Sequence, residues 1–408
     1  MFVLLKNGTV NGEISDVLIE NETIFSVRKD IFCASAKVID CTGLFIIPGI
    51  FDMHVHLREP GQTHKEDIST GGKAAAAGGV TGLMCMPNTS PVIDSPELVR
   101  EIIKRAKITK IKVYPCASIT KGLRGKELTD FRELKKAGAI AVSDDGRPVE
   151  NDNLMRRAMV LAKQAGLKII SHCEDLNAAN PRIGENTITE REVSISEELN
   201  APIHIAHVST KEALDHIRRA KATCTHKISG FPPVTCEVTP HHFTLTEKEL
   251  LKRDGDYCMN PPLRQDDDIR EIIRSLSLGA IDCIASDHAP HTAEEKADFE
   301  GVPNGVIGLE TILSVTLTQL YHTGILPMSK IVDLLCVNPR RILGIPGGEI
   351  KEEAAADLCV FAPDEEWTVV PEKLHSKSKN TCFKGLTLKG RVKYTLVDGE
   401  VVYDDSRA

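Results

Sequence analysis

Two histidines separated by a single residue, His54 and His56, form the first candidate metal-binding feature of this sequence. In an extended strand, side chains two residues apart point to the same face, so both imidazoles can bind one cation. The chain has 14 histidines, and in such a sequence a pair of this kind is more often structural than metal-binding. The pair therefore needs further ligands before it predicts a metal site.

Four more side chains that can bind metal lie at or near the C-terminal ends of separate apolar runs: Asp145, His172, His207 and Asp287. Imidazole and carboxylate groups bind zinc and related divalent cations. Two cations about 3.5 to 4 Å apart can share a bridging carboxylate and activate a water molecule as a nucleophile at neutral pH. Spacing does not decide between Asp144 and Asp145 as the bridge, since an Asp-Asp-Gly run is also a common helix-capping turn.

The chain has eight short apolar runs, five of which carry these residues at or near their C-terminal ends, and segments with helical spacing, such as 94–107, 153–166 and 210–221, lie between most of the runs. This alternation predicts a parallel sheet. Eight buried strands favour a closed (β/α)₈ barrel, whose active site lies at the C-terminal strand ends. The open doubly wound sheet is disfavoured because no G-x-G-x-x-G turn follows a strand. The runs are 45–56, 80–88, 112–118, 139–145, 168–174, 203–209, 234–240 and 281–288.

The two ends of the chain show a different pattern. Residues 12–27 and 391–405 alternate between apolar and polar side chains, as strands with one solvated face do, and Asp398-Gly399 is typical of a tight hairpin turn. A length of 408 residues also exceeds what one hydrophobic core usually serves. We expect an α/β protein with a barrel over 48–344 and a small β-sandwich-like domain built from 1–47 and 345–408.

Composition indicates an ordinary globular protein with a small-molecule partner. The formal charge of −8 is spread along the chain, which argues against a nucleic-acid or anionic-membrane surface. No apolar run is long enough to span a membrane, and the first residues lack the regions of a signal peptide, so we expect a cytoplasmic protein. None of the cysteines forms a C-x-x-C pair, and Cys85, Cys173 and Cys283 are expected to be reduced core thiols.

Eight motifs occur in a specific order along nearly the whole chain: PGIFDMHVHLREPG (48–61), MPNTSPV (86–92), SDDG (143–146), SHCED (171–175), HVSTKE (207–212), EVTPHH (237–242), MNPPLR (259–264) and SDHAPHT (286–292). Their order and spacing resemble the dihydroorotase family of cyclic amidohydrolases, in the branch that has an aspartate where other amidohydrolases use a carboxylated lysine. The resemblance implies the reversible cyclisation of N-carbamoyl-L-aspartate to (S)-dihydroorotate and water, in pyrimidine biosynthesis.

The resemblance also implies two Zn²⁺ per chain, although Mn, Co or Fe suits the same ligand types. By this resemblance Asp145 is the bridge and Asp287 is both a ligand and the catalytic acid and base. The complete implied set has His54, His56 and Asp287 at the first ion, Asp145 between the ions, and His172 and His207 at the second.

Arg58 follows the histidine pair by two residues and can grip a substrate carboxylate through its planar guanidinium. From the residues alone, a surface ion pair with Glu59 or Glu66 is an equal alternative. The segment after Asp287, up to residue 308, is expected to form a mobile loop over the barrel mouth, with a plain solvated connection as the alternative. The resemblance implies substrate contacts from His56, Arg58, Asn88, Asn260, His291 and Gly305. The family often has an aromatic residue where this chain has Asn304, so of that pair only Gly305 is carried over.

The remaining histidines that we considered lack a convergent set of partners. His241 and His242 follow a strand end and are expected to support the site or the fold. Core or surface positions are expected for His64, His204, His216, His226, His322 and His375.

Two alternatives remain at this stage. Allantoinase and hydantoinase share the barrel and the histidine pair, and Asn88 with the DHAPHT run favours dihydroorotase over both. The second alternative is a non-catalytic, dihydroorotase-like scaffold for aspartate transcarbamoylase, which is disfavoured because all six ligand positions hold competent residues. A homo-oligomer and a complex with aspartate transcarbamoylase are both possible assemblies.

Overall fold

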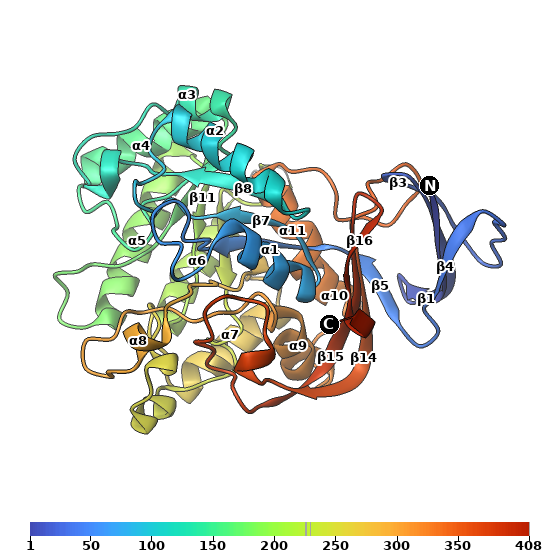
Figure 1. Cartoon of the computed structure of the whole chain (residues 1–408). Helices are drawn as coiled ribbons and strands as arrows, with labels where there is room; N and C mark the ends of the chain where they lie inside the picture. Colours follow the sequence, from blue (N-terminus) through green and yellow to red (C-terminus); the bar gives the residue numbers. More distant parts are fainter. Residues whose placement is uncertain (225–226, 229, 408) are drawn as a thin grey trace.

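The computed structural model describes residues 1–224, 227–228 and 230–407, so His226 lies outside the described residues. Figure 1 shows two lobes: a barrel surrounded by helices, and a smaller sheet that holds the N-terminal strands. Strands from both ends of the chain form the smaller sheet, whereas the middle of the chain forms the barrel. This arrangement confirms the expected fold class.

The barrel is an eight-stranded sheet in which consecutive strands are neighbours and every described pairing is parallel. A parallel bridge between Val55 and His288 joins its last segment to its first strand. Each of the eight apolar runs contains one of its strands, which confirms that prediction. The strands are β6 (Ile50–Val55), β7 (Val80–Cys85), β8 (Lys112–Ala117), β9 (Ala141–Val142), β10 (Lys168–Ser171), β11 (Ile203–Ile205), β12 (Val234–Val238) and β13 (Cys283–Ile284).

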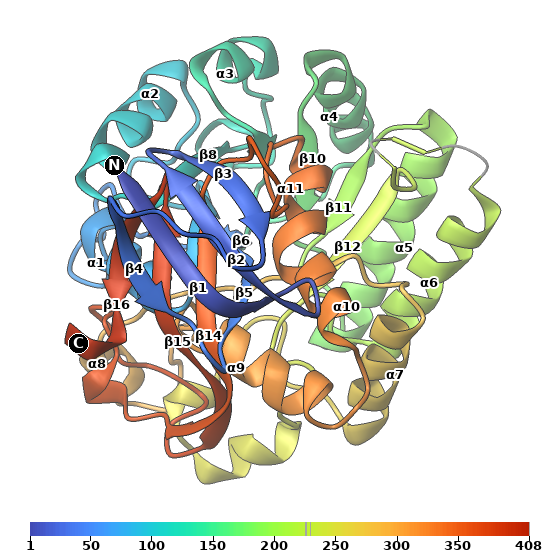
Figure 2. The same cartoon turned by 90° about the vertical axis from the view of Figure 1, so that its right-hand side faces the viewer.

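Helices surround this sheet, as Figure 2 shows from the side of the small lobe. Several begin at a side-chain cap that accepts a backbone N–H, including Ser95, Asn151 and Thr210, and this satisfies donors that the first helical turn leaves free. The three helical segments expected from spacing correspond to α2, α4 and α6. The helices are α1 (Ile68–Ala77), α2 (Pro96–Arg105), α3 (Phe131–Ala137), α4 (Asp152–Ala165), α5 (Pro181–Leu199), α6 (Lys211–Thr223), α7 (Asp266–Ser277), α8 (Ala293–Lys296), α9 (Ile312–Thr316), α10 (Met328–Val332) and α11 (Asn338–Leu343).

Buried side chains fill the barrel interior, so the barrel is a packed core. Phe51, Met53 and Met84 pack there with residues of α11. The buried guanidinium of Arg340 donates to the Gly49 carbonyl oxygen at 2.7 Å and lies over the Phe51 ring. These contacts close the N-terminal end of the barrel, which leaves the C-terminal strand ends to form the site.

The smaller sheet mixes parallel and antiparallel pairs. Asp398 and Gly399 both have positive φ and join β15 to β16, which confirms the expected hairpin. The apolar run 45–56 divides at Gly49: its first part pairs with strands of the small sheet, and its second part is β6. The strands are β1 (Phe2–Val10), β2 (Glu13–Glu20), β3 (Thr23–Arg28), β4 (Ala36–Asp40), β5 (Phe45–Pro48), β14 (Leu358–Thr368), β15 (Thr387–Val397) and β16 (Glu400–Asp404).

Charged contacts join the two sheets. The ammonium group of Lys112 on β8 lies 2.8 Å from Asp357 and 2.7 Å from Asp398, and these carboxylates flank β14 and the β15–β16 turn. These ion pairs join residues that are far apart in the sequence, and they hold the small sheet against the barrel. The domain limits near residues 47 and 345 stay predictions, because sheet membership does not define independent folding units.

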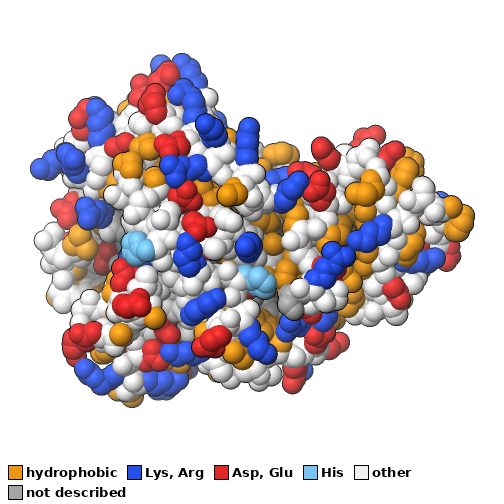
Figure 3. All heavy atoms as spheres, in the orientation of Figure 1, with side chains coloured by type: hydrophobic (Ala, Val, Ile, Leu, Met, Phe, Trp, Pro, Cys, Tyr) orange, Lys and Arg blue, Asp and Glu red, His pale blue; other side chains and the backbone are white. Residues whose placement is uncertain are grey.

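The outer surface is mixed in character. Figure 3 shows Lys, Arg, Asp and Glu side chains interspersed over the barrel, whereas apolar side chains gather on the small lobe. Phe25, Phe32 and Val38 are among the exposed apolar residues there. Within the described part of the chain, no helix has both the length and the apolar character that a membrane crossing requires. Cys85, Cys173 and Cys283 are buried free thiols, as expected.

Candidate metal centre

The C-terminal ends of the barrel strands bring the predicted metal ligands together. His54 and His56 belong to or directly follow β6, while His172 and His207 follow β10 and β11. His207, Asp287 and the nearby Arg58 have positive φ values of 31°, 48° and 59°. This conformation costs a non-glycine residue about 1 to 3 kcal/mol, and such strain is concentrated at functional sites.

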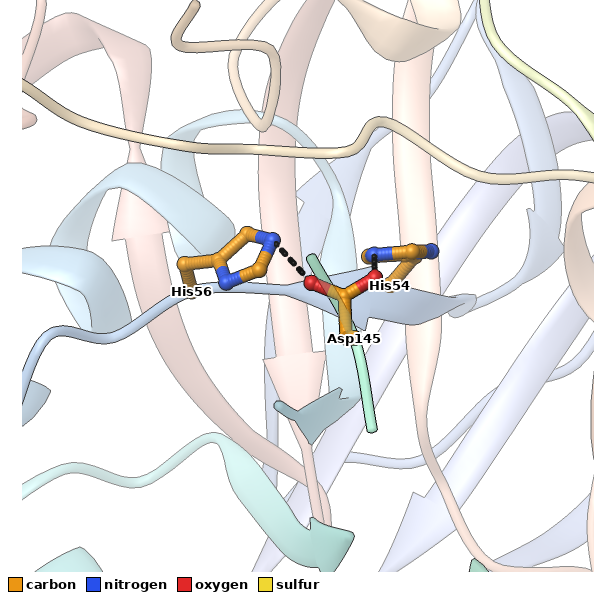
Figure 4. Close-up of side chains that lie close together, drawn as sticks. All are labelled: His54, His56 and Asp145. Carbon is orange, nitrogen blue, oxygen red and sulfur yellow. Dashed lines mark ion pairs between the residues drawn. The ribbon is translucent and has the colours of Figure 1, made fainter. Parts of the chain in front are cut away.

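Asp145 occupies the middle of the cluster. Figure 4 shows its carboxylate between the imidazoles of His54 and His56. Its Oδ1 lies 3.3 Å from Nε2 of His54, and its Oδ2 lies 3.5 Å from Nε2 of His56. The same Oδ1 lies 3.6 Å from Nδ1 of His172 and 3.9 Å from Nε2 of His207. One carboxylate therefore faces four imidazoles.

Two groups of potential ligands share this residue. His54, His56 and Asp145 form one group, and Asp145, His172 and His207 form the other, each with its ligand atoms within 4.8 Å of one another. The Oδ1 atom of Asp287 lies 3.3 Å from Nε2 of His56 and 3.6 Å from Nε2 of His54, beside the first group. Asp145 is thus common to two adjacent groups of side chains that could hold a metal ion.

The structure separates the two neighbouring aspartates. Asp144 accepts a hydrogen bond from the backbone N–H of Thr120 at 2.9 Å and another from its hydroxyl group. Asp144 is thus used to fix the loop after β8, and burial raises its pKa to about 6. Only Asp145 of the pair belongs to the ligand groups, and the geometry favours it as the bridge.

The electrostatics of the centre reflect closely packed opposite charges. Burial disfavours the ionised form of Asp145, but the charge of the neighbouring His54 and the proximity of the His207 and His56 imidazoles hold its pKa well below the usual range. Burial also disfavours the protonated form of His54, yet Asp145, Asp287 and Glu237 raise its pKa well above the usual value. For both Asp145 and His54, the effect of neighbouring charges on the pKa outweighs the effect of burial. The centre therefore strongly favours added positive charge beside its carboxylates.

In three of the imidazoles, the ring nitrogen that points away from Asp145 lies within hydrogen-bond distance of an acceptor group. Each of these imidazoles has a different acceptor. Nδ1 of His54 lies 2.7 Å from Oε1 of Glu237, and Nδ1 of His56 lies 2.8 Å from Oδ1 of Asn88. Nε2 of His172 lies 3.0 Å from Oε2 of Glu174. A hydrogen bond of this kind fixes the tautomer of a metal-binding histidine and orients its ring.

The donor set fits a bound cation. Nε2 of His54 is buried and has no hydrogen-bond partner, although it faces two carboxylates. Only a proton or a cation between this nitrogen and the two carboxylates avoids a costly repulsion, so a bound cation can take the place of the proton that otherwise charges His54. Nδ1 of His172 and Nε2 of His207 are 2.9 Å apart, within hydrogen-bond distance, so both nitrogens lie close enough to bind one cation in place of the shared proton. The residues therefore suit hard or borderline divalent metals.

Sequence reasoning missed Glu237 and Glu174 as partners of ligands. Glu237 is fully buried on β12, and a glutamate inside the apolar run VTCEV is a signal that could have found it. Glu174 follows His172 by two residues in the SHCED motif, but an acidic residue in a loop carries no comparable signal. His288 was also missed; its Nδ1 accepts from the Gly308 backbone N–H at 3.2 Å and ties down the loop after β13.

Arg58 and His291 lie together beside the centre. Nη2 of Arg58 is 3.2 Å from Nε2 of His291, and Nε donates to the Pro290 carbonyl oxygen at 3.1 Å. Burial lowers the pKa of Arg58 to about 10, so it stays charged at neutral pH. Burial and the charges of Arg58 and Lys65 lower the pKa of His291 to about 3, so it is neutral there. A charged guanidinium beside a neutral imidazole suits an anionic ligand group.

The other expected substrate contacts surround the same centre. The Asn88 amide donates to Oδ2 of Asp145 at 3.2 Å, and the Asn260 amide donates to Oε2 of Glu174 at 3.0 Å. Gly305 has a φ of 137°, and a Cβ there would lie 2.7 Å from the Ala289 carbonyl oxygen, so the loop requires glycine at this position.

The loop between Asp287 and residue 308 includes α8 and is anchored. The buried Lys296 ammonium group donates to the Cys258 and Pro303 carbonyl oxygens at 3.1 and 2.8 Å. Of the histidines assigned to the core or surface, His204 is buried, His64 is exposed and His216 is half-buried. His322 and His375 are also half-buried and contact Pro363 and Glu310. His241 and His242 are both buried after β12.

A (β/α)₈ barrel with histidine and aspartate ligands on its C-terminal rim, accompanied by a β domain from both chain ends, defines the metal-dependent amidohydrolase class. An L-hydantoinase (dihydropyrimidinase) from Arthrobacter aurescens superposes with a TM-score of 0.89 at 24% identity, covering 99% of this chain and 96% of that chain. A dihydropyrimidinase from Brevibacillus agri gives 0.88 at 23% identity, covering 99% and 95%. These identities establish a shared fold alone.

Sequence comparison identifies the family. A family model described as Dihydro-orotase-like matches residues 43–182. A dihydroorotase from Geobacter metallireducens is 44% identical over 412 residues, covering 96% of this chain and 95% of the relative. A dihydroorotase from Aquifex aeolicus is 40% identical over 428 residues, covering 99% of both. The chain belongs to the dihydroorotase family.

Replacing the central carboxylate should release metal. We expect Asp145→Asn to weaken metal binding by more than the ~10 to 100-fold that is typical for residues behind a ligand, because it removes an anionic oxygen shared by both groups. Metal per chain after dialysis against a graded series of chelators measures the effect. Asp144→Asn is the matched control and should retain its metal, since Asp144 bonds to Thr120. Full metal retention by Asp145→Asn would exclude Asp145 as the bridge.

Proposed function

We propose that this chain is a catalytically active dihydroorotase, which interconverts N-carbamoyl-L-aspartate and (S)-dihydroorotate plus water by using two bound divalent metals. The observation that carries the proposal is that two ligand groups share Asp145, while the charged Arg58 lies beside them. Kinship with dihydroorotases over nearly the full chain supports the choice of substrate.

Each metal has its own proposed ligands. His54, His56 and Asp287 would hold the first ion, His172 and His207 would hold the second, and Asp145 would contribute to both. Zinc is the default for imidazole and carboxylate donors. When bound, such ions polarise the substrate carbonyl and make water more acidic.

Asp287 is the proposed proton carrier. In hydrolysis, a water oxygen forms a bond to the ring carbonyl carbon and the carbon–nitrogen bond breaks; the carboxylate of Asp287 takes one water proton and delivers it to the departing nitrogen, and the second water proton passes from the new carboxyl group to Asp287, which ends the reaction protonated. Cyclisation follows the reverse path, in which protonated Asp287 supplies the proton that leaves with water. The position of Asp287 beside His54 and His56 supports this role.

Arg58, Asn88 and His291 are proposed to bind the substrate carboxylate, since Arg58 can donate two parallel hydrogen bonds to it. Asn260 is proposed to contact the substrate ring and Gly305 to offer a backbone contact, with His56 at the edge of the same space. The Asn88 and Asn260 amides bond to Asp145 and Glu174, so we expect them to share or exchange these bonds when substrate binds.

The cellular context stays a prediction. We propose a cytoplasmic enzyme of de novo pyrimidine synthesis that acts on a small molecule. Assembly as a homo-oligomer or with aspartate transcarbamoylase is compatible with this activity, and the exposed apolar side chains of the small lobe offer one surface for it.

Activity of the metal-loaded protein tests the proposal. We expect cyclisation of N-carbamoyl-L-aspartate and hydrolysis of dihydroorotate, both abolished by chelator and restored by metal. Hydantoin and allantoin should be much poorer substrates, because hydantoin lacks the carboxylate that Arg58 would bind. Preference for either would favour the corresponding alternative, and metal binding without turnover of any of these compounds would favour a scaffold.

Loss of Arg58 should act on substrate binding. A charge-assisted hydrogen bond contributes about 1.5 to 3 kcal/mol, so Arg58→Met should raise KM for dihydroorotate by about 10 to 100-fold. Dihydrouracil, which has the ring without the carboxylate, should be affected little. Arg219→Met is the matched control, since the Arg219 side chain is 74% exposed on α6. An equal change for both substrates would contradict a carboxylate-binding role.

The two directions of the reaction should depend oppositely on pH. Hydrolysis needs ionised Asp287 and should gain as pH rises, whereas cyclisation needs the protonated carboxyl group and should gain as pH falls. Initial rates in both directions, from mildly acidic to alkaline pH, measure this. Asp144→Asn should leave both profiles in place, because Asp144 bonds to Thr120. Parallel profiles would contradict the assignment of Asp287.

A further inference from the structure

Glu237 lies inside the barrel and directly contacts the metal centre. It is fully buried on β12, and its Oε1 is 2.7 Å from Nδ1 of His54. Its Oε2 is 3.3 Å from Nε2 of His204, and the backbone N–H of His207 donates to Oε1 at 3.4 Å. Burying a carboxylate in a packed interior costs free energy unless its oxygens accept hydrogen bonds. We therefore expect the buried Glu237 to have a specific role.

The hydrogen bonds around Glu237 have one consistent direction. A carboxylate only accepts hydrogen bonds, so Nε2 of His204 carries the proton that Glu237 accepts, while the Thr235 hydroxyl, which donates to the Ile203 carbonyl oxygen at 3.2 Å, lies 2.9 Å from Nδ1 of His204. The other carboxylate oxygen then accepts the Nδ1 proton of His54. This leaves the lone pair of His54 on Nε2, which is the unpartnered atom that faces Asp145 and Asp287.

The other ligand histidines have weaker support. Nδ1 of His56 is held by the neutral amide of Asn88, and Nε2 of His172 by Glu174, whose side chain is 18% exposed. Glu237 is fully buried, and electrostatic attraction strengthens as the local dielectric falls. His54 is thus the ligand whose orientation and donor strength depend most on the residue behind it.

We infer that Glu237 is a positioning residue for the first metal: it holds His54 in the tautomer that presents Nε2 and strengthens that nitrogen as a donor. A carboxylate behind a ligand histidine has both effects. This inference rests on the two-ion site of the proposed function and adds a residue to it. Glu237 touches neither the proposed substrate contacts nor the second ion's imidazole nitrogens.

A direct metal-binding role for Glu237 is a poorer account. His204, Glu237 and Cys283 do form a compact buried group of potential ligands. Both nitrogens of His204 and both oxygens of Glu237 already have hydrogen-bond partners, however, and the Cys283 thiol contacts the Met53 sulfur at 3.3 Å. These contacts satisfy the group without an ion.

Glu237→Gln tests the inference with little change in shape. The amide can still accept from His54 while a tautomer change at His204 accommodates its NH₂ group, so the variant removes the charge. We expect one of the two ions to bind ~10 to 100-fold more weakly and the other to change far less. Metal per chain across a graded chelator series measures this without substrate. After saturation with metal, KM should stay near that of the unchanged chain, since Arg58 is untouched.

Glu192→Gln is the matched control. Glu192 is also a buried glutamate, but it lies on α5 and pairs with Arg191. We expect it to retain both ions with unchanged affinity. Thermal unfolding of the metal-free proteins shows whether each substitution preserves the fold.

Glu237→Asp is an independent second variant, and it tests the inference even if Glu237→Gln does not fold. It keeps the charge but withdraws the carboxylate from His54, so selective weakening of one ion is again expected. Unchanged affinity for both ions in the variants, or equal weakening of both, would overturn the inference and leave the proposed function standing. An unchanged chain that binds fewer than two ions would overturn both.

Discussion

The central constraint on this structure is the packing of carboxylates and imidazoles on one buried rim. Asp145 faces four imidazoles, and Asp287 lies within 3.6 Å of two of the same rings. Groups this close repel one another or lack partners unless protons or cations intervene, and Nε2 of His54 shows the deficit as an unpartnered buried atom. The rest of the barrel holds this arrangement in place despite its cost.

The packed barrel strands stabilise this unfavourable arrangement of charges. Strained backbone at His207 and Asp287 persists because the strands before them are packed on both faces. Arg340 and the apolar side chains of the barrel interior close the opposite end, so the strand ends cannot shift independently. Preorganised ligands gain affinity because little order remains to be imposed when a cation binds.

Substrate recognition and metal binding are linked through the same strand ends. Arg58 follows His56 by two residues, and its contacts with Pro290 and His291 connect β6 to the loop after β13. Asn88 bonds to both His56 and Asp145, so a residue proposed for the substrate also orients the ligands. A substitution of Asn88 is therefore expected to affect both substrate binding and metal binding.

Much of this molecule could be predicted from local sequence patterns. Each of the eight apolar runs contains a barrel strand, because strands buried on both faces need continuous apolar sequence. The run 45–56 has the pattern of one apolar stretch, although the expected domain limit at residue 47 falls inside it; only the pairing of β5 with β1 and β14 shows that two strands meet at Gly49. Asp144 and Asp145 differ for the same reason: Thr120 holds one of them, and no pattern in SDDG reveals it.

The sequence by itself determined which residues stand at strand ends, because apolar periodicity and the order of motifs are properties of short segments. Only the tertiary structure decided which ring nitrogen of each imidazole faces Asp145 and which residue forms a hydrogen bond with the other nitrogen. His54 meets Glu237 across 183 residues, and Arg58 meets His291 across 233. Closure of the barrel creates such contacts, and their geometry depends on the packing of strands that share no local signal.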